Sequence, residues 1–361
     1  MPSHASRGPR RPLHCALLGL THPHSAALLA ALERVPAIGR VTLWAEDRGA
    51  RLPVAGKADG ISADLDAVLG EPTVDFALVC LRPDRSAAVA RRVIAAGRHL
   101  LTEKPAGLTA AEIGGLVRAA ERAGVLAAVL YPNRLHPVAT EARRLCRAGA
   151  LGPLLSLEAR CLTTQVRFRD PRSWLFRHRQ AGGGILTWLG CHYLDLLQHV
   201  SGDDIVAVAA TLARRSGEAI DVEDAAALTL QFRSGAVGTF HAGYALAFSG
   251  GGYMNPAGND AYLAWNGRDG RLVWPDPLQP RLHLELPGPR PVRTRSFRLA
   301  PGATAGSHCR EAVIRRFAAA VRGREENPIP LAAAWRTARL LEAAARAQAT
   351  GRRVPVASPA S

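Results

Sequence analysis

Two short segments, far apart in the chain, carry residues suited to acid–base chemistry. A Glu-Lys-Pro triplet holds Lys104, one of only two lysines among 46 basic residues. Where arginine supplies nearly every other positive charge, a retained lysine indicates a need for a compact amine that can lose its proton. The second segment contains His192 and Asp195, which would share one face of a helix because they are three residues apart. A histidine held by a carboxylate is a suitable general acid or base near neutral pH.

The first predicted strand–turn–helix unit is where a nucleotide-binding fold would hold a phosphate, because amides at a helix N-terminus attract anions. Such loops usually follow the pattern G-x-G-x-x-G. Here Gly19 is the only one of these glycines, and Thr21 and His24 stand at the other two positions. The side chain of Thr21 restricts the approach of a pyrophosphate, while His22, Ser25 and backbone amides are candidate donors. A βα turn without a ligand is the alternative.

An acid at the end of the second predicted strand would select the cofactor. Glu46, with Asp47 as the second candidate, stands roughly 20 residues beyond the loop, where a carboxylate accepts the ribose hydroxyls of NAD. Acids there disfavour the 2′-phosphate of NADP, although Arg48 next to them leaves NADP open. We therefore predict NAD as the cofactor, with Glu103 and Lys104 also in its site.

The elements that must position these residues alternate between short apolar runs and helical patterns. This alternation predicts a doubly wound parallel sheet with helices on both faces. Ligands of such sheets bind at the carboxyl ends of the strands, which places Lys104 in the cleft. The predicted strands are 13–20, 41–44, 74–81, 99–102 and 125–130, and the predicted helices are 25–35, 86–96 and 109–123.

The pattern changes after residue 131, where alternating, β-rich segments predict a mostly antiparallel sheet with one open face. The predicted strands are 154–161, 205–212, 225–232, 237–244 and 261–266, followed by irregular loops and edge strands over 267–302 and helices over 309–349. We expect a flexible basic tail over 1–12, a dinucleotide-binding domain over 13–130 and an α+β domain for substrate binding and oligomerisation over 131–361. The last helix could pack back on the first domain.

Taken together, these motifs resemble the glucose–fructose oxidoreductase / inositol dehydrogenase / MocA (Gfo/Idh/MocA) family. Members have an N-terminal nucleotide-binding domain, a Glu-Lys-Pro motif and a helix of the form GGG-x-L-x-D-x-G-x-H-x-x-D. The resemblance extends from Leu13 to about Val356 and includes Asn133-Arg134, Pro137, Trp174, Val222-Glu223-Asp224 and Thr350-Gly351-Arg352.

The resemblance implies hydride transfer between a nicotinamide cofactor and a secondary alcohol or ketone of a sugar-like or cyclitol-like molecule. Lys104 would lie near the nicotinamide and the substrate. His192 would move the hydroxyl proton, and Asp195 would orient its imidazole. Arg134 would line the cleft.

One departure from the family pattern concerns the substrate side. Trp188 stands where the family has an aspartate, four residues before the histidine, so an apolar ring replaces a carboxylate. It could stack on a sugar face or close the pocket. Trp174 and Tyr244 are further candidate substrate contacts, with packing as the alternative. The altered helix and phosphate loop leave two other functions open: an NAD-dependent glycosidase that acts by transient oxidation, and a non-catalytic nucleotide- or sugar-binding regulatory protein.

Composition narrows the classes of partner. The net charge of +16 could attract nucleic acid, but no nucleic-acid-binding motif accompanies the arginines. Six scattered cysteines without a Cys-x-x-Cys pair disfavour disulfides and structural zinc and favour the cytoplasm. His22-Pro23-His24 lacks a third ligand, so no metal is predicted. No run of 18 apolar residues suggests a membrane span. The expected partners are a polyol or sugar and further copies of the chain, as a homodimer or homotetramer through the C-terminal sheet.

Overall fold

The computed structural model describes residues 11–47, 56–247, 259–276, 279–289, 292–298 and 305–357. Residues 1–10 of the predicted basic tail, and Arg48, lie outside the described residues. The chain forms two compact units, Met1–Pro132 with Gly306–Trp335, and Asn133–Ala305 with Arg336–Ser361. The segment 306–335 therefore groups with the N-terminal unit. Within the described residues no helix is long and apolar enough to cross a membrane.

The first unit contains a six-stranded sheet in the order β3-β2-β1-β4-β5-β6, with all neighbouring strands parallel. This order is that of a dinucleotide-binding fold, so the predicted parallel sheet is confirmed. Every residue of β1 and β4 is buried, which explains why both appear in the sequence as unbroken apolar runs. The strands are β1 (Leu13–Leu18), β2 (Ile38–Trp44), β3 (Ala58–Ser62), β4 (Phe76–Val79), β5 (His99–Thr102) and β6 (Ala127–Val129).

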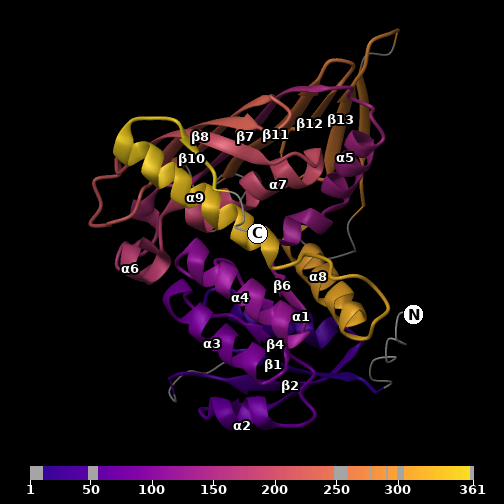
Figure 1. The fold of residues 1–361 in the computed structure, drawn as a ribbon, viewed down its shortest axis with the longest axis vertical. Helices are drawn as coiled ribbons and strands as arrows, with labels where there is room; N and C mark the ends of the chain where they lie inside the picture. Colours follow the sequence, from indigo (N-terminus) through magenta and orange to yellow (C-terminus); the bar gives the residue numbers. More distant parts are fainter. Residues whose placement is uncertain are drawn as a thin grey trace. The chain divides into compact units, whose positions relative to one another are not determined.

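Helices pack against this sheet (Figure 1). The N-terminus of α4 has a capping box, in which Thr109 accepts from the amide of Glu112 while the Glu112 carboxylate reaches back to the Thr109 amide. The later segment with α8 returns to the edge of the sheet, where the Val129 amide donates to the Ile329 carbonyl over 3.0 Å. The helices are α1 (Ser25–Arg34), α2 (Leu65–Gly70), α3 (Pro83–Ala95), α4 (Ala110–Ala123) and α8 (Ala305–Val321).

The second unit is built on a nine-stranded sheet in the order β14-β13-β12-β11-β7-β10-β9-β8-β15. Only β10 and β7 are parallel neighbours, so the prediction of a mostly antiparallel sheet is confirmed. The segment 267–302, predicted as irregular loops and edge strands, contributes β12, β13 and β14 at one edge of this sheet. The strands are β7 (Leu154–Thr164), β8 (Ile205–Ala213), β9 (Ala225–Phe232), β10 (Val237–Leu246), β11 (Asn259–Gly267), β12 (Arg271–Trp274), β13 (Arg281–Glu285), β14 (Val292–Ser296) and β15 (Val354–Pro355).

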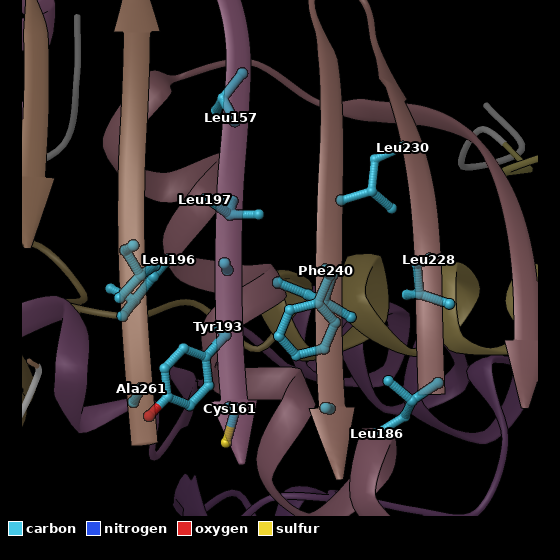
Figure 2. Close-up of a cluster of buried hydrophobic side chains, with 14 of the residues drawn as sticks. Leu157, Cys161, Leu186, Tyr193, Leu196, Leu197, Leu228, Leu230, Phe240 and Ala261 are labelled. Atoms are coloured by element: carbon cyan, nitrogen blue, oxygen red, sulfur yellow. The ribbon is translucent and has the colours of Figure 1, made fainter. Parts of the chain in front are cut away.

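One face of this sheet is covered and the other is largely open. Figure 2 shows Tyr193, Leu196 and Leu197 of α7 lying over the strands among the buried side chains of Leu157 and Phe240. On β9 and β10 buried residues alternate with exposed or half-buried ones, as expected for a sheet with one solvated face. Because α7 is fixed by its apolar side, the side that carries His192 has a defined orientation. The helices are α5 (Pro137–Arg147), α6 (His178–Ala181), α7 (Cys191–Ser201) and α9 (Ala332–Thr350), the last beginning in the first unit.

Candidate active site

The turn between β1 and α1 requires a glycine at its first position. Gly19 has φ +108°, and a Cβ there would lie 2.3 Å from the carbonyl oxygen of Cys80. Both the left-handed backbone and this close approach to the end of β4 exclude a side chain. No side chain caps α1 at its start, and its N-cap residue is His24. Gly19 therefore allows the tight turn for which the first glycine of a phosphate loop is needed, while the two later glycines are missing.

A cavity of about 390 Å³ opens beside this turn. It lies at the carboxyl ends of β1, β2 and β4, where parallel sheets bind their ligands. Glu46 and Asp47 reach it from the end of β2, as the sequence predicts, and Thr21 reaches it from the turn. Its full lining is Gly19, Leu20, Thr21, Ala45, Glu46, Asp47, Leu81, Arg82 and Arg85.

Ser25 stabilises the turn. Its hydroxyl is buried and donates to the Gly19 carbonyl over 2.9 Å, and Cys80 Sγ lies 3.5 Å from the same hydroxyl oxygen. Cofactor binding by Ser25 stays a prediction.

Glu103 ties the turn to the Glu-Lys-Pro segment. Its carboxylate is buried, with Oε1 2.9 Å from His24 Nδ1 and Oε2 accepting from the Lys104 amide over 3.0 Å. Burial alone would raise the pKa of Glu103, but His24, His22 and Lys104 hold it well below its usual value. The ionised Glu103 carboxylate therefore fixes the orientation of the His24 ring. Lys104 follows the carboxyl end of β5 and is 2% exposed.

His22 is the buried partner in this cluster. Its Nδ1 accepts from the His24 amide over 3.1 Å, and the two rings meet edge to face at 5.0 Å. Burial lowers the pKa of His22 to about 3. His22 is therefore neutral near pH 7 and can act as the acceptor that the His24 amide needs.

The depressed pKa of His22 predicts a loss of stability in mild acid. Between pH 6.5 and 5, His22 becomes protonated in the unfolded chain but stays neutral in the folded chain. The free energy of unfolding therefore falls as the pH falls. The share of one such group is about 1.4 kcal/mol per pH unit below its unfolded pKa. Urea titrations at several pH values should give a shallower slope for His22→Asn than for the unchanged chain. Equal slopes would show that His22 is protonated in the folded state.

In the second unit, the helical segment that carries His192 begins at a run of glycines, and the side chain of Glu223 caps its N-terminus. Gly182 ends α6 in the left-handed region at φ +77°. A Cβ on Gly184 would lie 1.9 Å from the Glu223 carbonyl oxygen. The Glu223 carboxylate accepts from the amides of Gly184 and Leu186 over 2.8 and 3.1 Å. Burial raises the pKa of Glu223, although these amides act in the opposite direction. Sequence reasoning noted Glu223 only as part of the family pattern and missed this role.

The segment that follows is a π-helical turn, Leu186–Gly190, which continues directly into α7. Such wide turns occur often at functional sites because they shift the side chains that follow. Trp188 lies on this turn and is 3% exposed. Its ring meets Trp174 edge to face at a centroid distance of 5.6 Å. The two tryptophans predicted to contact substrate thus pack on each other.

Asp195 is held by arginines. Arg134 donates to both of its carboxylate oxygens over 2.7 and 2.5 Å, and Arg336 lies 3.8 Å away. Asp195 is 1% exposed and Arg134 8%, so this is a buried, bidentate ion pair. Arg134 therefore orients the Asp195 carboxylate, and orientation of His192 by Asp195 stays a prediction.

Tyr244 belongs to the core of the second unit. It is 5% exposed, its ring meets Phe176 at 5.6 Å, and the Arg169 guanidinium lies 5.2 Å from its centroid. This packing favours the structural alternative over a substrate contact. Among the described residues no group of three or more histidines, cysteines, aspartates or glutamates could hold a metal ion.

Two family models cover most of the chain. Residues 13–131 match a model described as the oxidoreductase family with an NAD-binding Rossmann fold, and residues 139–260 match the GFO/IDH/MocA C-terminal domain.

Named relatives are similar over parts of their length. D-xylose dehydrogenase of Paenarthrobacter nicotinovorans is 32% identical over 145 residues, which are 39% of this chain and 37% of that protein. Inositol 2-dehydrogenase 2 of Saccharopolyspora erythraea is 26% identical over 232 residues, 61% of this chain and 62% of that protein. The chain thus matches less than two thirds of the length of either curated relative.

Solved structures share the fold over almost the whole chain. An oxidoreductase domain protein from Kribbella flavida superposes with a TM-score of 0.85 at 23% identity, covering 96% of this chain and 99% of that one. Levoglucosan dehydrogenase in complex with NADH and L-sorbose gives a TM-score of 0.80 at 19% identity, with the same coverage. At these identities the likeness establishes the fold alone.

Proposed function

Because the chain belongs to the Gfo/Idh/MocA family, we propose that it transfers hydride between NAD and a secondary alcohol or ketone of a sugar-like or cyclitol-like molecule. The observation that carries this proposal is the cavity beside Gly19, with Glu46 at the end of β2. A Cβ at residue 19 would collide with the Cys80 carbonyl, so Gly19 performs the task of the first glycine of a dinucleotide-binding loop, which is to allow the tight turn. Its residues fit the adenosine and phosphate parts of NAD.

The proposed division of labour follows from side-chain chemistry. When bound, NAD supplies a ring carbon that accepts or gives the hydride. In the oxidative direction His192 takes the substrate hydroxyl proton. The Lys104 amine stabilises the negative charge that develops on oxygen in this step. Glu103 fixes the backbone of Lys104 and the ring of His24, and thereby links the lysine to the phosphate turn.

The open face of the nine-stranded sheet supports a proposal about assembly. Val237 is 60% exposed there, and a cavity of about 960 Å³ is lined by residues of β7 to β11 and by the end of α9. We propose that this face joins copies of the chain into a homodimer or homotetramer. We also propose that the protein acts in the cytoplasm.

Nucleotide binding and turnover can be tested on the purified chain. We expect NADH to quench tryptophan fluorescence in a saturable titration, and NADH to form from NAD with at least one member of a panel of aldoses, anhydrosugars and inositols. Light scattering on the same preparation should give a mass of two or four chains. Absence of NADH binding would contradict the proposal. Binding without turnover on the whole panel would instead favour a regulatory protein, for which Trp188 in place of the family aspartate is the supporting feature.

A further inference from the structure

The cavity at the carboxyl ends of β1, β2 and β4 carries two charges of each sign. Glu46 and Asp47 come from the end of β2, and Arg82 and Arg85 come from the start of α3. A pocket for NAD needs a carboxylate for the ribose hydroxyls, whereas one for NADP needs a cation for the 2′-phosphate. The cavity contains residues suited to NAD and residues suited to NADP. Which cofactor is preferred depends on how these carboxylates and guanidinium groups pair with one another.

Glu46 and Arg85 form an ion pair with a particular geometry. Both Nε and Nη2 of Arg85 lie 3.0 Å from the same oxygen, Oε1 of Glu46. The other oxygen, Oε2, is outside this ion pair. The arginine thus holds the carboxylate in one orientation while leaving an oxygen for a ligand hydroxyl. The side chain of Arg85 is 56% exposed and that of Glu46 is 35% exposed, so both remain accessible from the cavity.

Arg82 is paired differently. Its Nε and Nη2 donate to the two oxygens of Asp84, each over 3.1 Å. This partner lies on the same helix and does not involve Glu46. A change at Glu46 would therefore release the charge of Arg85 and leave that of Arg82 neutralised.

We propose that Arg85 is the specificity-determining residue of the nucleotide pocket, acting through Glu46; this inference rests on the proposed function. With Glu46 ionised, Arg85 presents Oε2 to the ribose hydroxyls, and the carboxylate repels a 2′-phosphate. Without that charge, the planar guanidinium of Arg85 becomes a ligand for the 2′-phosphate, to which it can donate two parallel hydrogen bonds. The pocket is built for NAD but holds a latent NADP site.

Dissociation constants of NADH and NADPH, measured by fluorescence titration of the full chain, test this inference. Glu46→Gln keeps the shape of the side chain and removes its charge. We expect this variant to shift the ratio of the two constants toward NADPH by about tenfold or more. This is the effect expected when one charge-assisted contact to the 2′-phosphate is gained. Because the phosphate contact is exposed, the gained affinity should weaken as salt is added.

A second substitution identifies the cation. In Glu46→Gln/Arg85→Ala the gained NADPH affinity should disappear, and Arg85→Ala alone should weaken NADH binding severalfold because Glu46 loses its orientation. Arg92→Ala serves as the matched control, since Arg92 lies on the same helix and pairs with Asp66 outside the cavity. It should leave both constants unchanged. Adenosine 2′,5′-bisphosphate and 5′-AMP, which lack nicotinamide, should repeat the pattern of NADPH and NADH.

The outcomes separate this inference from the function on which it rests. An unchanged ratio in Glu46→Gln, or a gain that survives Arg85→Ala, would overturn the role of Arg85. A preference of the unchanged chain for NADPH would overturn it as well. If neither dinucleotide binds the unchanged chain, the proposed function itself fails.

Discussion

Lys104→Met is expected to lower kcat by about 10²–10³-fold, the usual cost of removing one positioned charge from an oxyanion. Methionine matches the stem of the lysine as far as Cε and lacks only the amine. The lysine is 2% exposed, so this apolar replacement should keep the fold. The amine matters only as charge builds on the substrate oxygen, and the KM should therefore change less than kcat. Steady-state kinetics with circular dichroism on the same sample would measure both.

His192→Asn should give a second large loss in kcat, of about 10²–10⁴-fold, because it removes the proposed proton acceptor. Its residual activity should rise with pH, as hydroxide or water replaces the imidazole. NADH dissociation constants of both variants should stay within a few-fold of the unchanged chain, which separates catalysis from cofactor binding. Near-normal turnover in either variant would remove that residue from the mechanism.

Asp195→Ala is expected to lower the free energy of unfolding by about 3–5 kcal/mol, because it leaves the Arg134 guanidinium buried without its carboxylate. The pair is almost fully enclosed, with Asp195 1% and Arg134 8% exposed. Removing both charges together avoids the unpaired cation, so Arg134→Met/Asp195→Leu should recover much of the loss. Chemical denaturation of these two variants and of the unchanged chain measures this difference.

An exposed ion pair provides the control for this prediction. Arg316 and Glu325 lie 2.8 Å apart with side chains 46% and 40% exposed, and Glu325→Ala should cost only about 0.2–1 kcal/mol. A small effect at Asp195, similar to that at Glu325, would mean that water reaches the Arg134 site.

The sequence was most informative where structure depends on local pattern. The buried strands β1 and β4 appear as continuous apolar runs because both faces of a parallel sheet are covered. Gly19 was correctly expected at the first turn, and Glu46 and Asp47 were correctly placed at the end of β2. Each of these features follows from residues close together in the chain.

Features that depend on distant residues could not be predicted in the same way. Glu223 caps the segment at Gly184 and Leu186 from nearly forty residues away, and Arg134 reaches Asp195 across 61 positions. Neither pairing can be recognised from a pattern in the sequence. Any acid of the chain could have capped the glycine segment, and any arginine could have paired with Asp195. The π-helical turn before α7 was missed for a related reason, because local helical propensity does not distinguish it from an ordinary α-helical start.

The carboxylate of Glu223 limits how the segment that carries His192 can change in sequence. By accepting from the amides of Gly184 and Leu186 it anchors the start of the histidine segment to the strand that follows Glu223, and those amide hydrogens should exchange slowly with deuterium. An inserted or deleted residue between Gly184 and His192 would rotate the imidazole away while the anchored end stayed in place. We therefore expect this segment to tolerate replacement of side chains, such as Trp188 in place of the family aspartate, better than a change in the number of residues.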